Sequence, residues 1–464
     1  MPRLYDTATG ETTELRLRTP GQVSLYVCGP TVYDAPHLGH GRFSLVFDVL
    51  RRYLLFVGLE VTYVSNITDI DDKVIERAAS AGTTPDALTA HYEQVWWDAM
   101  GALGVLRPDE VPHATAYVAR MVEVVAELVA RGVAYETSDG VYLSVADVPG
   151  YGLLARQPLE SLRAGARVEA GEEKRSPLDF VLWKKAKPGE PTWPSPWGPG
   201  RPGWHTECVV MSLDLLGDGF DIHGGAIDLI FPHHENERAQ AVALGRDFAH
   251  HWVHNGWVTV DGEKMSKSLG NFTSLDDFLS RADARAYRLL VLRSHYRSPI
   301  EITPDTVAQA EAQVTRLDEL ARRFDLDDPL AATPFVRDPG TTGVPERDEA
   351  VARFRAAMDD DLDTPGALAG VFELVRRANT VADGSGTDAA RPLAAAVVEI
   401  CAAMGLRLRR GSGELDSETA GLVAERDDAR ARRDFARADA VRDELTGRGW
   451  LVEDTPAGTR VRRP

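Results

Sequence analysis

Two short strand-forming runs with a helix between them constrain the fold more than any other feature. Ser24–Cys28 is one run and ends at a Gly-Pro pair, and Val61–Val64 is the other. In Phe43–Leu54 apolar residues recur mostly at spacings of three and four, which predicts a helix that ends near Gly58. The order strand, loop, helix, strand is typical of the start of a doubly wound parallel sheet, in which ligands bind beyond the carboxyl ends of the strands.

Length and composition disfavour a membrane protein and a secreted one. The chain has 464 residues, so we expect about two to four domains. No run approaches the roughly 18 apolar residues of a membrane span, and the N-terminus lacks the apolar stretch of a signal peptide. Three cysteines, Cys28, Cys208 and Cys401, are too few for a disulfide framework and suit a reducing compartment. We therefore expect a cytoplasmic protein with no membrane contact.

The net charge of −19 weighs against a nucleic-acid partner when it is taken alone. Binding to phosphates normally needs a basic surface. A large acidic protein can still carry a local basic patch, however, and net charge says nothing about patches. The composition therefore leaves an RNA partner open.

The motif His37-Leu38-Gly39-His40 lies between the first strand and the first helix. Gly39 allows a ligand to approach the backbone closely. The positive end of the following helix favours anionic phosphate groups at the same place. The alternative is a pair of solvated loop histidines.

A second motif, Lys264-Met265-Ser266-Lys267-Ser268, follows a predicted strand and an Asp-Gly turn. Two lysines in a glycine-flanked loop suit a polyphosphate, because their charges can neutralise a departing pyrophosphate in the transition state. An isolated pair of lysines at this spacing is usually solvated surface, whereas the complete string after a strand is far more specific.

Four residues form a candidate metal site: Cys28, Cys208, His233 and Glu237. His233 and Glu237 are four residues apart and share one face if they lie on a helix. Two sulfurs, one nitrogen and one carboxylate oxygen would make a plausible four-ligand zinc site. The spacing alone does not decide the set, because three neighbours are rival ligands: His223, His234 and Glu235. Glu237 could also be a plain surface acid.

An acidic turn follows the second predicted strand and contains Asp69, Asp71 and Asp72. It could bind Mg²⁺. We favour a turn that caps a helix and forms ion pairs.

The two motifs together resemble those of class I aminoacyl-tRNA synthetases. In that family an HIGH-type and a KMSKS-type motif enclose ATP on a Rossmann-like sheet. Here the first motif reads HLGH and the second matches letter for letter. Four further segments look like cysteinyl-tRNA synthetases in particular: Tyr26–Tyr33, Tyr63–Lys73, Pro202–Cys208 and Asp221–Glu237.

The resemblance implies roles for the residues at matching positions. The zinc-ligand positions are occupied by Cys28, Cys208, His233 and Glu237. The residues implied to bind Mg²⁺-ATP are His37, Gly39, His40, Lys264 and Lys267, of which the histidines and lysines are the catalytic groups. Thr68 and Trp204 are implied to line the amino-acid pocket, although ordinary packing is an alternative for Trp204. The implied reaction activates L-cysteine with ATP to cysteinyl-adenylate and transfers it to the 3′ end of tRNA(Cys).

The resemblance also divides the chain, whose expected fold class is α/β. It implies a Rossmann-like, parallel-sheet catalytic domain at residues 1–115 and 200–255 with an inserted connective subdomain at 116–199. A KMSKS-loop and stem-contact region at 256–310, a helical bundle at 311–410 and a small C-terminal anticodon-binding domain at 411–464 complete the chain. The insertion is too short for a large hydrolytic editing domain. We expect the protein to act as a monomer.

The C-terminal segment is where we expect contact with tRNA. Trp450 could stack on a base, and a set of arginines could contact phosphates: Arg430, Arg432, Arg433, Arg437, Arg460, Arg462 and Arg463. The alternative is a solvated helix, because nearby acidic residues almost balance these arginines.

Two rival functions share parts of this pattern. The cysteine ligase of mycothiol synthesis resembles the same catalytic core but joins cysteine to an amino sugar, and it lacks the C-terminal unit that Trp450–Arg460 indicates here. A zinc-stabilised RNA-binding paralogue without activity should have damaged motifs, and both motifs are intact.

Overall fold

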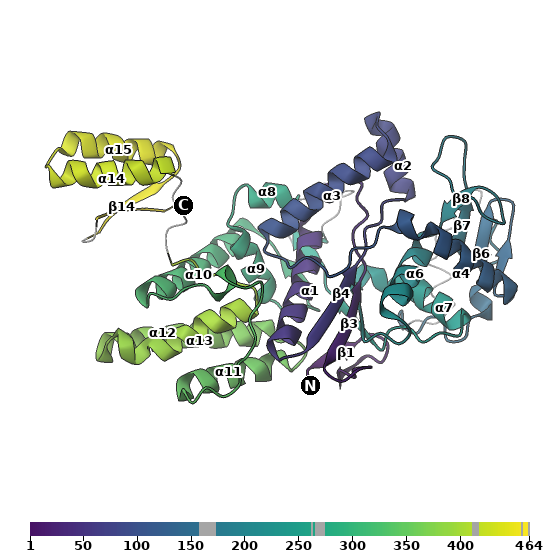
Figure 1. Cartoon of the computed structure of the whole chain (residues 1–464), viewed down its shortest axis with the longest axis horizontal. Helices are drawn as coiled ribbons and strands as arrows, with labels where there is room; N and C mark the ends of the chain where they lie inside the picture. The colour runs from purple at the N-terminus through teal and green to yellow at the C-terminus, as the bar shows by residue number, and fades with distance from the viewer. Residues whose placement is uncertain (157–172, 261–262, 265–273, 411–416, 456–457, 463–464) are drawn as a thin grey trace.

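A four-stranded parallel sheet forms the centre of the molecule (Figure 1). This computed structural model describes all residues except 157–172, 261–262, 265–273, 411–416, 456–457 and 463–464. The strand order is β10-β9-β3-β4. The strands are β3 (Gln22–Val27), β4 (Glu60–Ser65), β9 (Ile222–Ala226) and β10 (His251–Asn255). Helix α1 (Leu38–Phe56) connects β3 to β4, which confirms the predicted order of strand, loop, helix and strand.

The side chains of β3 alternate between two hydrophobic cores, because successive residues of a strand point to opposite faces of the sheet. Leu25 and Val27 belong to a core that continues through α1 into the helical bundle. Tyr26 belongs to the other core, which Cys28 joins just after the strand. This alternation directs Cys28 toward the face of the sheet that α6 (Trp204–Leu216) covers.

An antiparallel sheet forms a separate layer on one side of the parallel sheet (Figure 1). It contains β5 (Ala134–Glu136), β6 (Gly140–Leu143), β7 (Phe180–Lys185) and β8 (Gly200–Pro202). Helix α4 (Val118–Ala130) packs between this sheet and α6, sharing a core with both. Two short 3-10 turns, Ala114–Tyr117 and Val145–Asp147, flank the helix and β6. Strand β8 belongs to this sheet and begins at Gly200, so the sheet extends just past residue 199, where the inserted subdomain was expected to end.

Further helices and strands lie around the parallel sheet. They are the hairpin β1 (Arg3–Asp6) and β2 (Glu11–Glu14), the helices α2 (Asp72–Ala81), α3 (Pro85–Ala102) and α7 (Glu235–Ala243), and a small sheet of β11 (Val258–Val260), β12 (Glu263–Lys264) and β13 (Ile300–Glu301). The apolar run Leu229–Phe231 suggests a short strand from sequence, but it does not form one. The segment lies in the helical turns Ile227–Leu229 and Ile230–His234, which lead directly into α7.

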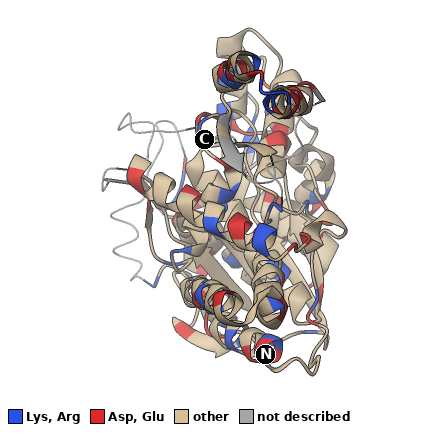
Figure 2. Cartoon of the chain, turned by 90° about the vertical axis from the view of Figure 1, so that its left-hand side faces the viewer, with Lys and Arg blue, Asp and Glu red and all other residues tan. Residues whose placement is uncertain are grey.

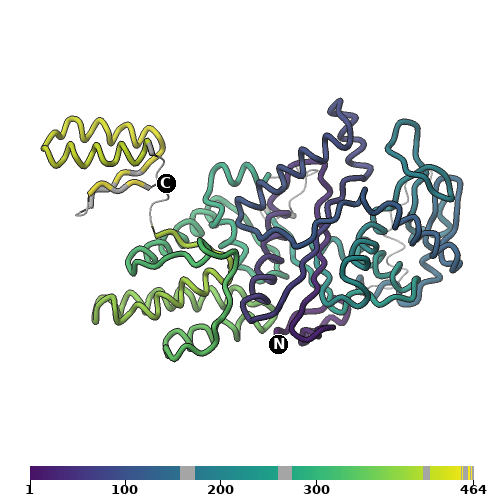
Figure 3. Tube along the Cα trace, viewed as in Figure 1, coloured from purple at the N-terminus to yellow at the C-terminus, as the bar shows by residue number. Residues whose placement is uncertain are grey.

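A helical region lies on the opposite side of the parallel sheet from the antiparallel layer (Figure 3). Its helices are α8 (Leu275–Leu279), α9 (Ala284–Leu292), α10 (Pro304–Arg323), α11 (Pro345–Met358), α12 (Thr364–Ser385) and α13 (Thr387–Ala403). A 3-10 turn, Pro329–Ala331, follows α10. The bundle is continuous with the core of α1 and contains the buried Cys401.

The C-terminal unit stands apart from the body of the molecule (Figure 1). It consists of α14 (Ser417–Ala431), α15 (Phe435–Gly447) and the hairpin β14 (Leu451–Thr455) and β15 (Gly458–Arg462). Its core is small and contains Leu422, Val441, Leu445, Trp450 and Val461. Trp450, which the sequence suggested could stack on a base, is only 8% exposed and fills this core, so it presents no open face for stacking.

Candidate active site

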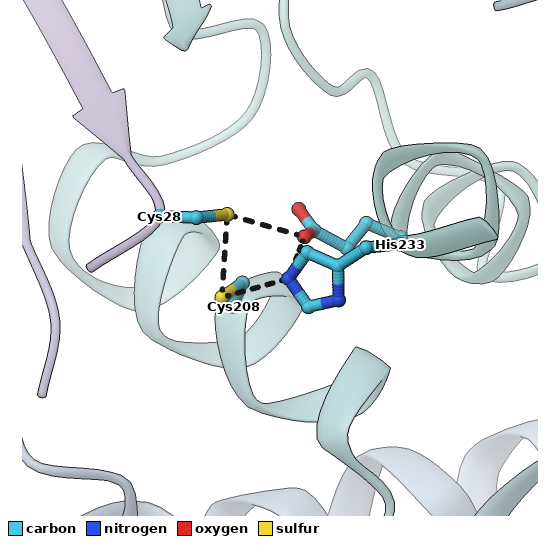
Figure 4. A group of neighbouring side chains, drawn as sticks. Cys28, Cys208 and His233 are labelled. Carbon is cyan, nitrogen blue, oxygen red and sulfur yellow. Dashed lines mark hydrogen bonds and ion pairs between the residues drawn. The ribbon is translucent and has the colours of Figure 1, made fainter. Parts of the chain in front are cut away.

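Four side chains that are distant in the sequence meet on one face of the parallel sheet (Figure 4). Cys28 follows β3, Cys208 lies on α6, His233 lies in the helical turn before α7, and Glu237 lies on α7. One donor atom from each lies within 4.8 Å of the other three, and all four side chains are buried. We call these four side chains the metal cluster.

The spacing of the donor atoms fits a tetrahedral metal site. The two sulfurs are 3.6 Å apart, and Cys208 Sγ is 3.6 Å from His233 Nε2. Cys28 Sγ is 3.4 Å from Glu237 Oε1, which is 2.8 Å from His233 Nε2. Two sulfurs that each lie about 2.3 Å from a tetrahedral zinc are about 3.8 Å from each other. The donor types and their spacing therefore fit a zinc ion.

Two neighbouring histidines contact the atoms of His233 and Glu237 that point away from the other members of the metal cluster. His233 Nδ1 lies 2.9 Å from His205 Nδ1, and Glu237 Oε2 lies 2.6 Å from His223 Nε2. Metal-binding side chains commonly have such outer partners, which orient them and fix the histidine tautomer.

A second set of donors overlaps with the metal cluster. It shares Cys28 and Glu237 and contains His223 and His234 in place of Cys208 and His233. His234 Nε2 lies 3.3 Å from Cys28 Sγ, and His234 Nδ1 lies 2.8 Å from His254 Nε2. The structure thus brings together two of the three rival ligands. The third, Glu235, instead accepts a hydrogen bond from the Leu154 amide at 2.7 Å.

The charges of the metal cluster depend on one another. Burial and the neighbouring Cys208 raise the pKa of the Cys28 thiol. Burial also opposes ionisation of Cys208, but the hydrogen bond with Cys28 and the nearby His233 outweigh it and lower its pKa to about 6. Glu237 outweighs the burial of His233 and raises the pKa of that imidazole to about 10. The pKa of Glu237 is well below its usual range despite burial, because His233 and His223 stabilise the carboxylate. The shifts at Cys208 and Glu237 favour anionic donors at this site.

A hydrogen-bonded chain connects the ends of β3 and β4 to α6. The Gly29 amide donates to Asn66 Oδ1 at 2.8 Å, and Asn66 Nδ2 donates to Thr68 Oγ1 at 3.1 Å. Thr68 Oγ1 donates to Glu207 Oε2 at 3.0 Å. Thr68 therefore lies beside the residue that precedes Cys208.

Trp204 covers the metal cluster from the side of an open cleft. Its ring stacks on His233 with centroids 3.8 Å apart, and its side chain is 36% exposed. The cleft has a volume of ≈560 Å³ and lies between α6 and the antiparallel sheet. One face of the Trp204 ring packs on His233, and the side chain also lines the open cleft. Both roles considered from the sequence, packing and lining of a pocket, are therefore compatible with its position.

The first motif forms the N-terminal end of α1. His37 is the N-cap, and its Nδ1 accepts a hydrogen bond from the His40 amide at 3.3 Å. His40 Nδ1 accepts from the His37 amide at 3.2 Å, and the two rings stack with centroids 3.7 Å apart. Leu38 is buried, whereas His37, Gly39 and His40 are partly exposed. The motif thus presents two aligned imidazoles at a helix N-terminus, where the helix dipole favours an anion.

The segment after the second motif returns to the first. Ser274 forms an antiparallel bridge with His37, and the Leu275 amide donates to the Pro36 carbonyl at 2.9 Å. The backbone of Lys264 pairs with Thr259. Lys267 lies outside the described residues. The described end of the lysine-containing loop is therefore adjacent to the HLGH motif.

The acidic turn caps a helix and forms ion pairs, as we favoured from the sequence. Asp71 is the N-cap of α2 and accepts from the Lys73 amide at 2.9 Å. Asp72 pairs with Lys184 at 2.6 Å and also with Arg201. Asp69 accepts from the Thr115 amide at 2.9 Å.

The arginines of the C-terminal unit lie among acidic residues. Arg437 pairs with Glu425 at 2.7 Å, and Arg432 lies 3.7 Å from Asp428. Basic and acidic residues are mixed over this end of the molecule (Figure 2). Phe435, at the start of α15, is 63% exposed. Phe435 was not singled out from the sequence, although its position beside Arg432 and Arg433 was an available signal.

The comparisons with known proteins agree with this architecture. Residues 15–312 match the family described as tRNA synthetases class I (C) catalytic domain, and residues 353–409 match the DALR domain. The cysteine–tRNA ligase of Alkalilimnicola ehrlichii is 48% identical over 455 residues, which are 96% of each chain. The cysteine–tRNA ligase of Halorhodospira halophila is 47% identical and covers 100% of each chain. The chain belongs to the cysteine–tRNA ligase family.

Membership of the cysteine–tRNA ligase family makes the chain a ligase and confirms the resemblance seen in the sequence. The alignment covers the C-terminal unit as well as the catalytic domain. Because the amino-sugar ligase lacks such a unit, that alternative is not favoured.

Solved structures of class I synthetases share the fold, which confirms the expected α/β class. The methionyl-tRNA synthetase of Mycobacterium tuberculosis has a TM-score of 0.59 at 16% identity and covers 82% of this chain and 89% of its own. A LeuRS of Agrobacterium radiobacter, in a ternary complex, has a TM-score of 0.59 at 12% identity and covers 85% of this chain and 84% of its own. Among the described helices, none combines the length and apolar character of a membrane span.

Proposed function

We propose that the metal cluster binds one Zn²⁺ and that this ion selects the cysteine substrate of the ligase. The convergence of two thiols, an imidazole and a carboxylate in a buried region is the observation that carries the proposal. Bound there, Zn²⁺ would favour the deprotonated thiol of cysteine as a further ligand over the hydroxyl of serine. An apolar pocket alone separates such near-isosteres by only about 100-fold. Selection at the metal would make an editing domain unnecessary.

The outer hydrogen bonds support this ligand set over the overlapping one. With His233 and Glu237 as ligands, His205 and His223 become their outer partners through the contacts described above. The set also contains both thiols, which Zn²⁺ prefers to additional imidazoles. Cys28, Cys208, His233 and Glu237 are therefore the proposed ligands.

We assign Mg²⁺-ATP to the N-terminal end of α1. The stacked imidazoles of His37 and His40 and the backbone at Gly39 would contact the phosphates. The adjacency of Ser274 to His37 supports a role for Lys264 and Lys267 at the same phosphates, because the loop returns to this helix end.

The reaction then proceeds in two steps. A carboxylate oxygen of cysteine attacks the α-phosphorus of ATP, and the bond to the leaving pyrophosphate breaks. His37 and His40 stabilise charge on the phosphoryl oxygens, while Lys264 and Lys267 neutralise the pyrophosphate. A ribose hydroxyl at the 3′ end of tRNA then attacks the carbonyl carbon and releases AMP, and the hydroxyl proton is lost. No side chain forms a covalent intermediate, so catalysis consists of positioning and electrostatic stabilisation.

The C-terminal unit is the proposed contact for tRNA(Cys). Phe435 offers an open aromatic face at the start of α15, next to Arg432 and Arg433. An exposed aromatic among arginines suits the stacking of an unpaired base, with phosphates held nearby. The expected domain division, with anticodon binding at 411–464 and stem contact at 256–310, forms part of this proposal. The proposal also includes that the protein acts as a monomer and is located in the cytoplasm.

The deciding experiment compares two cysteines of the same chain. Cys208→Ser should lower zinc content well below one ion per chain and abolish cysteine-dependent exchange between ATP and pyrophosphate. Cys401→Ser is the matched control, because Cys401 is also buried but lies in the helical bundle. Full zinc content and full exchange in Cys208→Ser would refute the metal assignment. Atomic emission measures the zinc content of each variant. Circular dichroism measures whether the variant is folded, so loss of metal can be told apart from loss of fold.

A further inference from the structure

Glu207 is a buried carboxyl group that borders the cleft beside the metal cluster. Its side chain is 1% exposed, and it lines the cleft together with Trp204 and His205. It precedes Cys208 on α6, and Trp204 lies three residues earlier on the same face of that helix. Neither the ligand set nor the phosphate site involves Glu207.

One oxygen of Glu207 is held and the other is left for a ligand. Oε2 accepts from Thr68 Oγ1, which Asn66 orients in turn. Among the described residues, Oε1 forms no hydrogen bond, and no lysine or arginine pairs with Glu207. A buried oxygen without a hydrogen-bond donor is costly, so Oε1 is available to a donor that enters the cleft with a ligand.

Two of the cations that line the cleft are engaged with another carboxylate. Lys184 and Arg201 line the same cleft and both pair with Asp72. A ligand in the cleft can therefore supply the donor for Oε1. A cysteine held by its sulfur at the metal cluster carries an ammonium group on the adjacent carbon, close to the residue that precedes Cys208.

We propose that Glu207 binds the α-ammonium group of the cysteine substrate through Oε1. The proposal rests on the proposed binding of the substrate thiolate to zinc. Holding sulfur and ammonium together leaves the carboxylate as the group free to react, and it selects α-amino thiols over thiols without an amine. Thr68 acts through Glu207 as a positioning residue, because its hydroxyl fixes the orientation of the carboxylate.

Two thiol probes isolate the ammonium contact. Cysteamine has the thiol and the ammonium but no carboxylate, and 3-mercaptopropionate has the thiol and the carboxylate but no ammonium. Both are tested as competitive inhibitors of cysteine-dependent ATP–pyrophosphate exchange by the zinc-loaded full chain. Glu207→Gln should raise the inhibition constant of cysteamine and KM for cysteine by about 10- to 100-fold, because one charge-assisted hydrogen bond is lost. Inhibition by 3-mercaptopropionate and KM for ATP should change by less than about twofold on the same grounds.

Two further variants keep the interpretation unambiguous. Glu207→Asp keeps the charge and should retain part of the preference for cysteamine. Asp71→Asn removes a carboxylate from the same cleft while preserving a helix cap, and should leave both inhibition constants unchanged. The proposal would be overturned if Glu207→Gln weakened inhibition by both thiols equally or lost its zinc. It would also be overturned if Asp71→Asn weakened inhibition by cysteamine as much as Glu207→Gln does.

A cobalt-substituted protein separates this proposal from the one it rests on. Cys28 and Cys208 already give thiolate-to-cobalt absorption, so a probe thiol that binds the metal should add to it in the unmutated chain. Absence of any added absorption with both probes would refute coordination of the substrate thiolate and with it the proposed function. Normal absorption with no selective loss of cysteamine in Glu207→Gln would refute only the role of Glu207.

Discussion

His233 Nε2 lies 2.8 Å from Glu237 Oε1, one helical turn further along the chain, and both side chains are buried. The turn Ile230–His234 leads directly into α7, so the two side chains project from the same side of a nearly continuous helix. A buried pair of this kind is costly unless other groups complete it. Cys28 and Cys208 complete it here, each with its sulfur within 3.6 Å of one member of the pair.

Changes at the metal cluster should separate a ligand from its outer partner. Glu237→Ala removes a proposed ligand and should abolish stoichiometric zinc binding. His223→Ala removes only the partner of Glu237 Oε2 and should lower zinc affinity by about 10- to 100-fold. Competition with a chromophoric chelator measures both affinities. Equal affinities in the two variants would contradict the assignment of His223 as an outer partner.

The two phosphate motifs should affect activation of cysteine without affecting the metal. His40→Asn and Lys267→Ala should each slow ATP–pyrophosphate exchange by about 100-fold or more, the usual effect of removing one transition-state donor. Zinc content should stay at one ion per chain, because neither residue belongs to the metal cluster. An unchanged exchange rate in Lys267→Ala would remove that lysine from the mechanism.

Asp48 should stabilise the contact between α1 and the helical region. Its Oδ2 lies 2.8 Å from Arg52 Nε and 2.6 Å from Arg288 Nη1, and Arg288 also donates to the Met404 carbonyl. Asp48→Asn leaves two buried arginines without their carboxylate, so the free energy of unfolding should fall by about 3–5 kcal/mol. Glu349→Gln, which breaks an exposed pair with Arg353, should cost less than about 1 kcal/mol. Denaturant titration of both variants measures the difference.

The same carboxylate predicts a loss of stability in acid. Burial opposes ionisation of Asp48, but Arg52 and Arg288 outweigh it and hold its pKa below the usual value. A group with a lowered folded-state pKa stabilises the protein above its unfolded pKa of about 3.9, and this contribution disappears as the pH falls through the folded value. The stability difference between the unmutated chain and Asp48→Asn should therefore be constant from pH 7 to about pH 5 and shrink below about pH 4. A difference that grows in acid would contradict this sign.

Phe435 should contribute to tRNA binding without contributing to cysteine activation. Phe435→Ala should raise KM for tRNA by about 5- to 100-fold, the effect of losing one stacked base. ATP–pyrophosphate exchange should not change, since this unit stands apart from the active site. Phe435→Trp keeps an aromatic face and should restore binding. A normal KM for tRNA in Phe435→Ala would refute the stacking contact.

Patterns carried by neighbouring residues were predictable from the sequence. The strand, helix and strand from β3 to β4 follow from local periodicity, and the pairing of His233 with Glu237 follows from helical spacing. The capping role of Asp71 is likewise local. The burial of Trp450 was not predictable in this way, because exposure depends on what packs around a side chain, and residues of α14, α15 and β15 form the core that covers it.

The sequence by itself determined the types of donor that the chain offers, the two phosphate motifs and the α/β class, because these depend on residue identity and short-range spacing. Only the tertiary structure decided which donors meet. Cys28 reaches Cys208 because β3 alternates its side chains between two cores and α6 packs on one of them. The same packing brings His205 and His223 behind the metal cluster and buries Glu207 beside it. Contacts between residues so distant in the chain depend on how helices pack on the sheet, which no local pattern records.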